Sequence, residues 1–189
     1  MIGAITALLQ RNKPMNTLIK NKRIYLREIV KSDASFMYNL MNQHNWLSYI
    51  GDKNIKSVSA AAKYIESGPR LSYKNNGYGL YVVVDIGTDQ LVGVCGLMKR
   101  AYLNAPDLGF AISEDFYRKG YAFEAAQLIL KMVNSLVETD VIYAIVKTEN
   151  AGSRQLLSKL GFCVEAQTGL EAMESELVGL LLYKAKINK

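Results

Sequence analysis

The stretch YRKGYAFEAA, Tyr117–Ala126, decides how the rest of this sequence is interpreted. Two basic residues and a glycine lead into apolar positions that recur every three or four residues from Ala122 to Val137, a pattern that predicts a long amphipathic helix. A helix N-terminus presents unpaired backbone N–H groups and a partial positive charge, so the same stretch also suits a phosphate group. It matches neither a Walker loop nor a dinucleotide-binding fingerprint, and its spacing alone leaves both interpretations open.

The segments on either side of this stretch alternate between strand and helix patterns. Two β-rich runs flank Gly87-Thr88-Asp89, which predicts a hairpin, whereas the polar and aromatic segment His44–Asp52 is expected to be a loop. The predicted elements are strand 24–29, a helix through 36–41, helix 57–66 ended by Gly68-Pro69, strands 78–86, 90–98 and 107–112, helix 122–137, strand 141–146, helix 151–160, and strands 163–168 and 177–187. Their order, β α α β β β α β α β β, indicates an α/β (α+β) domain with a mixed, mostly antiparallel sheet of about seven strands and about four helices.

Length and composition fit one domain. The chain has 189 residues, half of them hydrophobic, which is enough for a core of its own. Met15 begins a segment that would serve equally well as a start, so we interpret residues 1–16 as an N-terminal extension and 17–189 as the single domain.

The charge of +6 comes from the start of the chain, because the first 31 residues hold seven Lys or Arg against one Glu and the remainder is balanced. A nucleic-acid face needs clustered basic charge and a reader motif, and neither is visible, so we expect no DNA partner. The apolar runs are shorter than the roughly 20 residues that cross a bilayer, so we expect no membrane partner and a cytoplasmic location.

Metal and nucleophile chemistry have little support in the sequence. Cys95 and Cys163 lie far apart in apolar surroundings and match no metal spacing, so we expect buried, reduced thiols and no metal. His44 is the single histidine, so a Ser-His-Asp catalytic triad would have to use it.

A second segment, Thr148–Phe162 (TENAGSRQLLSKLGF), changes the interpretation of Tyr117–Ala126. Together the two segments resemble the GCN5-related N-acetyltransferase (GNAT) family, in which a strand followed by a (Q/R)xxGx(G/A) loop binds the acetyl-CoA pyrophosphate and an Asn-containing segment ending in LGF borders the pantetheine arm. The resemblance includes IYLREI and PDLGFAI, covers roughly Arg23–Thr168, and is strongest to the branch of ribosomal-protein alanine and serine N-terminal acetyltransferases.

The resemblance implies a GNAT fold, acetyl-CoA as cosubstrate, and a set of residues that bind it. Tyr117 stands where the family often has Gln or Arg, but a loop that binds through backbone N–H groups tolerates this change. The implied cofactor-binding residues are Phe110, Ala111 and Ile112 on the strand, Tyr117, Arg118, Lys119, Gly120, Tyr121 and Ala122 in the loop, and Asn150 and Ser153 in the second segment.

The resemblance implies the catalytic residues less directly than the cofactor-binding ones. Many members protonate the departing thiolate with a Tyr seven residues after the motif Asn, and here that position is Leu157, so Ser153 is our candidate acid, or alternatively only a hydrogen-bond partner of the thioester. Asp107 is our candidate base, with a plain turn residue as the alternative. The lesser candidates for the base are Glu149, Glu165 and His44.

The acceptor is expected to be a primary amine. His44, Trp46 and Tyr49 lie in the segment that lines the acceptor side in this family, although Trp46 would equally serve as a core residue. We expect a peptide N-terminus as the acceptor, with a small amine (polyamine, amino acid or aminoglycoside) or a non-catalytic acyl-CoA-binding module as alternatives, in a monomer or homodimer.

Overall fold

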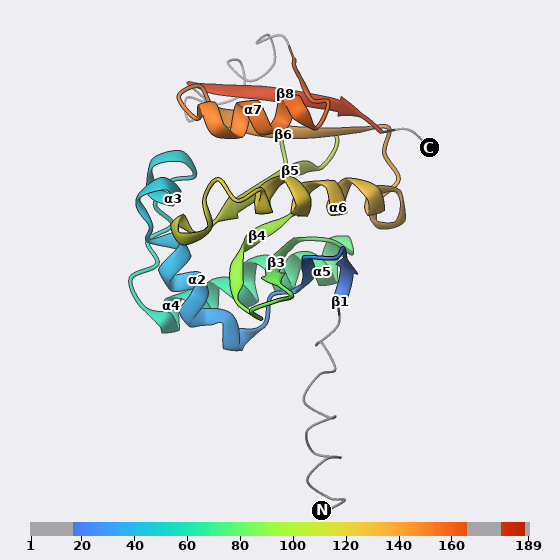
Figure 1. The fold of residues 1–189 in the computed structure, drawn as a ribbon. Coiled ribbons are helices and arrows are strands. Elements are labelled where there is room, and N and C mark those ends of the chain that lie inside the picture. The colour runs from blue at the N-terminus through green and yellow to red at the C-terminus, as the bar shows by residue number, and fades with distance from the viewer. Residues whose placement is uncertain (1–16, 166–178, 188–189) are drawn as a thin grey trace, which may run out of the picture.

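A computed structural model describes residues 17–165 and 179–187 and shows one sheet of eight strands flanked by helices (Figure 1). The strands are β1 (Thr17–Lys20), β2 (Ile24–Glu28), β3 (Leu80–Asp85), β4 (Leu91–Met98), β5 (Asp107–Ile112), β6 (Val141–Lys147), β7 (Cys163–Val164) and β8 (Leu180–Lys186). The helices are η2 (Lys31–Asp33), α2 (Ala34–Met41), α3 (His44–Tyr49), α4 (Val58–Ile65), η3 (Glu66–Arg70), α5 (Leu71–Asn76), η4 (Glu114–Phe116), α6 (Tyr121–Leu136) and α7 (Ala151–Lys159).

The sheet is antiparallel except at one place. Its strand order is β1-β2-β3-β4-β5-β6-β8-β7, and β5 pairs with β6 in parallel through a single residue pair, Asp107 and Tyr143. The mixed, mostly antiparallel sheet predicted from the sequence is thereby confirmed, and the observed bounds of β5 are those predicted.

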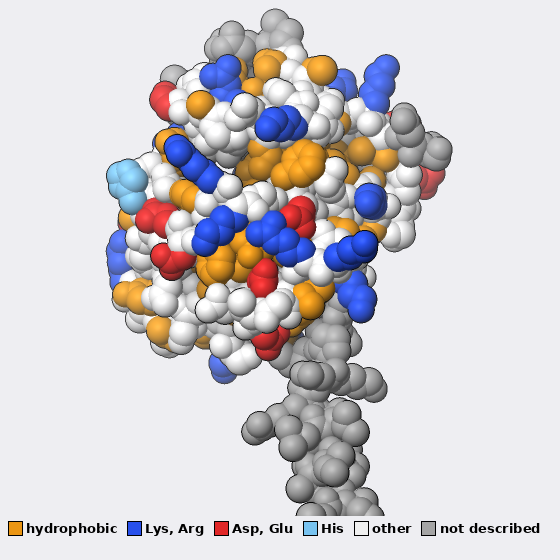
Figure 2. All heavy atoms as spheres, in the orientation of Figure 1, with side chains coloured by type: hydrophobic (Ala, Val, Ile, Leu, Met, Phe, Trp, Pro, Cys, Tyr) orange, Lys and Arg blue, Asp and Glu red, His pale blue; other side chains and the backbone are white. Residues whose placement is uncertain are grey.

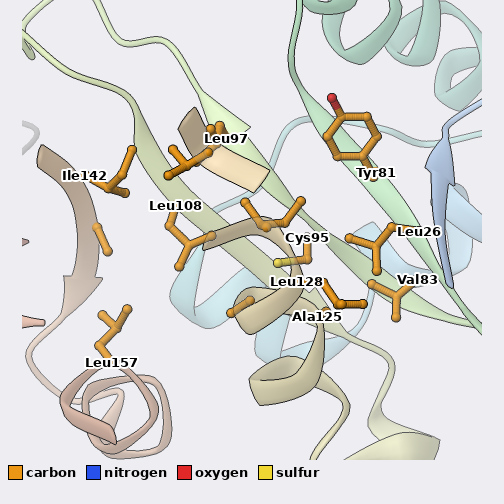
Figure 3. Packing of buried hydrophobic residues seen from close by; sticks show 14 of the residues in the cluster. Leu26, Tyr81, Val83, Cys95, Leu97, Leu108, Ala125, Leu128, Ile142 and Leu157 are labelled. Carbon is orange, nitrogen blue, oxygen red and sulfur yellow. The ribbon is translucent and has the colours of Figure 1, made fainter. Parts of the chain in front are cut away.

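The two faces of the sheet carry separate hydrophobic cores. Helices α6 and α7 cover one face, where Leu128 and Leu157 pack with strand residues such as Cys95 and Ile142 (Figure 3). Helices α2 to α4 cover the other face, over β2, β3 and β4. The predicted apolar stripe of α6 is therefore its buried side, because Ala125, Ala126, Ile129 and Val133 are all at most 1% exposed.

Three features differ from the predictions. The segment His44–Tyr49, expected to be a loop, forms the helix α3. The second predicted helix does not end at Gly68-Pro69 but continues through the π-helical turn η3, with Pro69 buried inside it, into α5. Strand β1 was not predicted; it forms the edge of the sheet beside β2. The predicted extension 1–16 and part of the predicted strands 163–168 and 177–187 lie outside the described residues.

Candidate active site

The strands β5 and β6 separate beyond their single point of contact. Tyr143 donates its backbone N–H to the Pro106 carbonyl at 3.0 Å, at the start of both strands. From there β5 continues in register with β4 alone, up to the pair of Ile112 and Gly93. The sheet is thus split between β5 and β6 on the side of their carboxyl ends, where open α/β sheets bind ligands.

Backbone groups of β5 point into this split. Ser113 donates its N–H to the Val92 carbonyl of β4 at 2.9 Å, so Ala111, two residues earlier, also directs its backbone groups toward β4. The intervening residues Phe110 and Ile112 direct their N–H and C=O groups the other way, toward β6. An extended polar chain placed in the split would find hydrogen-bonding partners there.

The loop Tyr117–Gly120 ends at the N-terminus of α6. Arg118 and Gly120 both have left-handed backbone conformations, with φ of 58° and 83°, and glycine at position 120 adopts this without a Cβ penalty. No side chain caps the helix, and the Glu124 N–H is bonded to the Gly120 carbonyl at 3.1 Å. The N–H groups of the first turn are left for another acceptor, which fits the phosphate interpretation.

The loop is fixed by contacts from distant parts of the chain. Arg23, just before β2, donates from Nη1 to the Lys119 carbonyl at 2.8 Å, and Lys119 donates from Nζ to the Asp115 carbonyl at 2.8 Å. Tyr121 donates its hydroxyl to Asp85 Oδ2 at 2.7 Å in a buried contact. Basic side chains gather on this face of the molecule, beside apolar ones (Figure 2). The contact of Arg23 with this loop was not predicted from the sequence.

The second segment forms the N-terminus of α7, after β6. Asn150 caps this helix, because its Oδ1 accepts the Ser153 N–H at 3.0 Å. Ser153 lies half-buried in the first turn of α7, one turn before Leu157. Leu157 is fully buried in the core (Figure 3), so this position serves packing and supplies no acid.

Asp107 lies at the point where β5 and β6 meet. Its side chain is buried and its Oδ1 accepts from Arg100 Nε at 3.0 Å. Burial raises the pKa of the Asp107 carboxyl, and the charge of Arg100 opposes this shift. Asp107 and Tyr143 are paired neighbours, so their side chains emerge on the same face of the sheet. Of the lesser candidates, Glu149 is exposed and Glu165 forms an ion pair with Lys184 at 3.1 Å.

Helix α3 spans the open end of the split. Gln43, just before α3, donates to Ser113 Oγ after β5 at 3.0 Å, and Lys147 at the end of β6 donates to the Ser48 carbonyl of α3 at 2.7 Å. Tyr49 is half-buried on this helix.

The predicted acceptor-side residues do not converge. Trp46 is 5% exposed and packs in the core beneath α3, which agrees with the alternative of a core residue. His44 is exposed and its Nε2 lies 3.3 Å from Ser48 Oγ.

The cysteines differ from one another. Cys95 is buried and Cys163 is exposed, so the expectation of burial was wrong for Cys163, which lies in the short edge strand β7. Within residues 17–165 and 179–187 no group of three or more His, Cys, Asp or Glu side chains is placed to hold a metal ion. No helix in the described part of the chain is long and apolar enough to cross a membrane.

A comparison with known protein families identifies the family of this chain. The family model described as an acetyltransferase (GNAT) domain matches residues 23–163. The chain belongs to the GNAT acetyltransferase family. As a GNAT member it is an acyltransferase with acetyl-CoA as its cosubstrate, as the resemblance implied.

Individual GNAT proteins resemble the chain over most of its length. The uncharacterized N-acetyltransferase YoaA of Bacillus subtilis is 26% identical over 149 residues, which cover 78% of this chain and 84% of YoaA. Two solved structures share the fold: RimL, a ribosomal L7/L12 α-N-protein acetyltransferase in complex with coenzyme A (TM-score 0.76, 16% identity, covering 91% and 98% of the two chains), and a putative ribosomal-protein-serine acetyltransferase from Vibrio cholerae (TM-score 0.70, 19% identity, covering 93% and 99%).

Proposed function

We propose that this protein transfers the acetyl group of acetyl-CoA to a primary amine, with the α-amine of a peptide N-terminus as the acceptor, by direct attack in a ternary complex. The observation that carries the proposal is the split between β5 and β6 beside the uncapped N-terminus of α6. The split supplies strand-like hydrogen bonds to an extended chain, and the N-terminus of α6 supplies N–H groups and the positive end of a helix dipole to an anion.

These two features support a specific way of binding the cosubstrate. The pantetheine arm pairs with the backbone groups of Phe110 and Ile112, while Ala111 pairs with Val94 of β4 and contributes only its side chain. The pyrophosphate accepts from N–H groups at the start of α6, around Tyr121 and Ala122, and the exposed side chains of Arg118 and Lys119 add positive charge. Asn150 and Ser153 border the arm from the N-terminus of α7.

The reaction requires that a proton is removed from the amine and that a proton is supplied to the departing thiolate. The neutral amine attacks the thioester carbonyl carbon, the C–S bond breaks, and a backbone N–H of β5 donates to the oxyanion. Asp107 receives the proton of the amine, directly or through water, and Ser153 donates toward the departing thiolate. The resemblance to the family supports these roles, together with the place of Asp107 where β5 and β6 meet.

The acceptor class follows from the weakness of this base. Asp107 is buried and paired with Arg100, and the exposed His44 lies on the outer side of α3. At about pH 7.4, about a fifth of an α-amine with a pKa near 8 is unprotonated, against roughly 0.1% of a lysine-type amine with a pKa near 10.4. A site with a weak base therefore suits an α-amine better than a polyamine.

Cosubstrate binding is tested by thermal unfolding with and without acetyl-CoA. We expect acetyl-CoA to raise the Tm of the wild type, and Gly120→Glu to abolish the rise by placing bulk and negative charge at the phosphate site. Gly77→Glu is the matched control, because Gly77 has a similar φ (77° against 83°) but lies at the C-terminal end of α5. It should lose stability and keep the Tm rise. No Tm shift of the wild type at millimolar acetyl-CoA would refute the proposal.

The acceptor is tested by release of free CoA thiol with a panel of amines. Peptides with a free α-amine should turn over faster than the same peptides with a blocked N-terminus and a lysine, and faster than spermidine or aminoglycosides. Turnover that is fastest with a small amine would replace the peptide as acceptor. Binding of acetyl-CoA without turnover on any acceptor would identify the protein as a non-catalytic acyl-CoA-binding module.

A further inference from the structure

The first turn of α6 carries a carboxylate close to where the proposed site needs an anion. Glu124 lies four residues after Gly120, and a Cβ built on Gly120 would be 3.9 Å from Glu124 Oε1. A free carboxylate at this distance would repel a phosphate group or accept the helix N–H groups itself. The proposed pyrophosphate site therefore requires that Glu124 be held and neutralised.

Two residues from the start of the sheet hold both oxygens of this carboxylate. Arg23 Nη1 donates to Glu124 Oε1 at 2.7 Å, and Asn21 Nδ2 donates to Glu124 Oε2 at 2.9 Å. Both donors lie in the turn between β1 and β2, and Glu124 is 101 residues from Arg23 and 103 residues from Asn21 in the sequence. The helix start is thus bound to the turn that leads into β2, and β3 and β4 lie between β2 and β5 in the sheet.

Arg23 also fixes the backbone of the loop. Its Nη1 donates to the Lys119 carbonyl at 2.8 Å, between the two left-handed residues Arg118 and Gly120. Its guanidinium carbon lies 3.9 Å from the centroid of the Tyr121 ring, which is anchored through its hydroxyl to Asp85. The guanidinium is therefore held on three sides, by a ring, a carbonyl and a carboxylate.

We propose that Arg23 is a positioning residue for the acetyl-CoA pyrophosphate: it neutralises Glu124 and holds it away from the N-terminus of α6, and it fixes the loop carbonyl at Lys119. The proposal rests on the proposed function of this loop. Because the Arg23–Glu124 pair is partly exposed, with 40% and 25% of the side chains accessible, it contributes little to stability and its removal leaves a folded protein.

The test is calorimetric titration of coenzyme A into four variants of the full chain: Arg23→Gln, Glu124→Gln, the double variant, and Arg70→Gln. Arg70 forms a similar exposed pair with Glu66, at 3.1 Å in the helical turn η3, and is the matched control. We expect Arg23→Gln to weaken binding by at least about fivefold, because a bare carboxylate then faces the phosphates. The double variant should regain most of the lost affinity. The loss of affinity in Arg23→Gln should be smaller at about 1 M salt, where charge repulsion is screened. Arg70→Gln should bind coenzyme A as the wild type does.

A purely structural role for Arg23 gives a different result. In that case removal of Glu124 would not restore binding and salt would not reduce the defect. Unchanged affinity in Arg23→Gln, or a double variant as weak as Arg23→Gln, would overturn this inference and leave the proposed function intact. Failure of the wild type to bind coenzyme A would overturn the proposed function, and this inference with it.

Discussion

The carboxyl group of Asp107 is subject to two opposed influences. Burial disfavours its charged form and raises its pKa, whereas Arg100 favours the charged form. The balance leaves the pKa above the usual value of an aspartate, which makes the carboxylate a somewhat better proton acceptor near neutral pH. Arg100 therefore tunes the base as well as holding it.

Removal of this tuning should be visible in the pH profile. In Arg100→Gln the Asp107 carboxyl loses its positive neighbour, so its pKa rises further. A base must be deprotonated to act, so the acidic limb of kcat/KM should move to higher pH, while Asp107→Asn should lower kcat by about 10²-fold to 10⁴-fold. Steady-state rates from pH 5 to 9 measure both effects. An acidic limb that stays in place in Arg100→Gln, with full activity in Asp107→Asn, would assign Asp107 a structural role.

Single residues also show which parts of the candidate site can be predicted from a sequence. Gly120 and the residues around it could be predicted as a binding loop because a loop and the start of a helix are contiguous in the chain. Arg23 contacts this loop from 96 residues away, and nothing in the sequence near Arg23 distinguishes it from a solvated basic residue. Trp46 was placed correctly only as an alternative, since an indole in a polar segment is compatible with a lid or a core.

At the scale of elements, strong local patterns were predicted well and weak ones were not. The hairpin β3–β4 and the helix α6 have clear periodicity and turn residues, and they lie where they were expected. Helix α3 has six residues, too few to show a repeating helical pattern, and it is held by the packing of Trp46 and by bonds of Gln43 to Ser113 and of Lys147 to the Ser48 carbonyl. Gly68-Pro69 indicated a stop, but the π-helical turn allows the chain to continue through the proline.

The start of α7 allows a test of whether Asn150 is only a helix cap. Its Oδ1 accepts the Ser153 N–H, so Asn150→Ala should lower the free energy of unfolding by about 1 kcal/mol. Asn150→Asp keeps the acceptor oxygen and should retain the stability, but it replaces the amide with a charge. If Asn150 also binds the cosubstrate, Asn150→Asp will raise the KM for acetyl-CoA without loss of stability. Denaturant unfolding and steady-state kinetics on the two variants give the answer, and an unchanged KM in both would leave Asn150 as a cap alone.

At the scale of the whole molecule, the sheet consists of two parts that meet at one pair of residues. Strands β1 to β5 form one part and β6, β8 and β7 the other, joined through Asp107 and Tyr143. The sequence predicted the succession of strands β2 to β8 along the chain from local patterns. It could not give the pairing of β1, because four residues at a sheet edge carry no pattern of their own until β2 is beside them.

A ligand that fills the split should protect alternate amides of β5. Phe110 and Ile112 direct their N–H groups into the split, whereas those of Ala111 and Ser113 are directed toward β4, with Ser113 bonded to Val92 at 2.9 Å. In amide hydrogen exchange followed by NMR, we expect Phe110 and Ile112 to exchange quickly in the free protein and slowly with coenzyme A, because the pantetheine arm then accepts their N–H groups. Ala111 and Ser113 are internal controls on the same strand and should be protected in both states. Equal slowing of all four amides would indicate general stabilisation of the fold, and unchanged exchange at Phe110 and Ile112 would place the arm elsewhere.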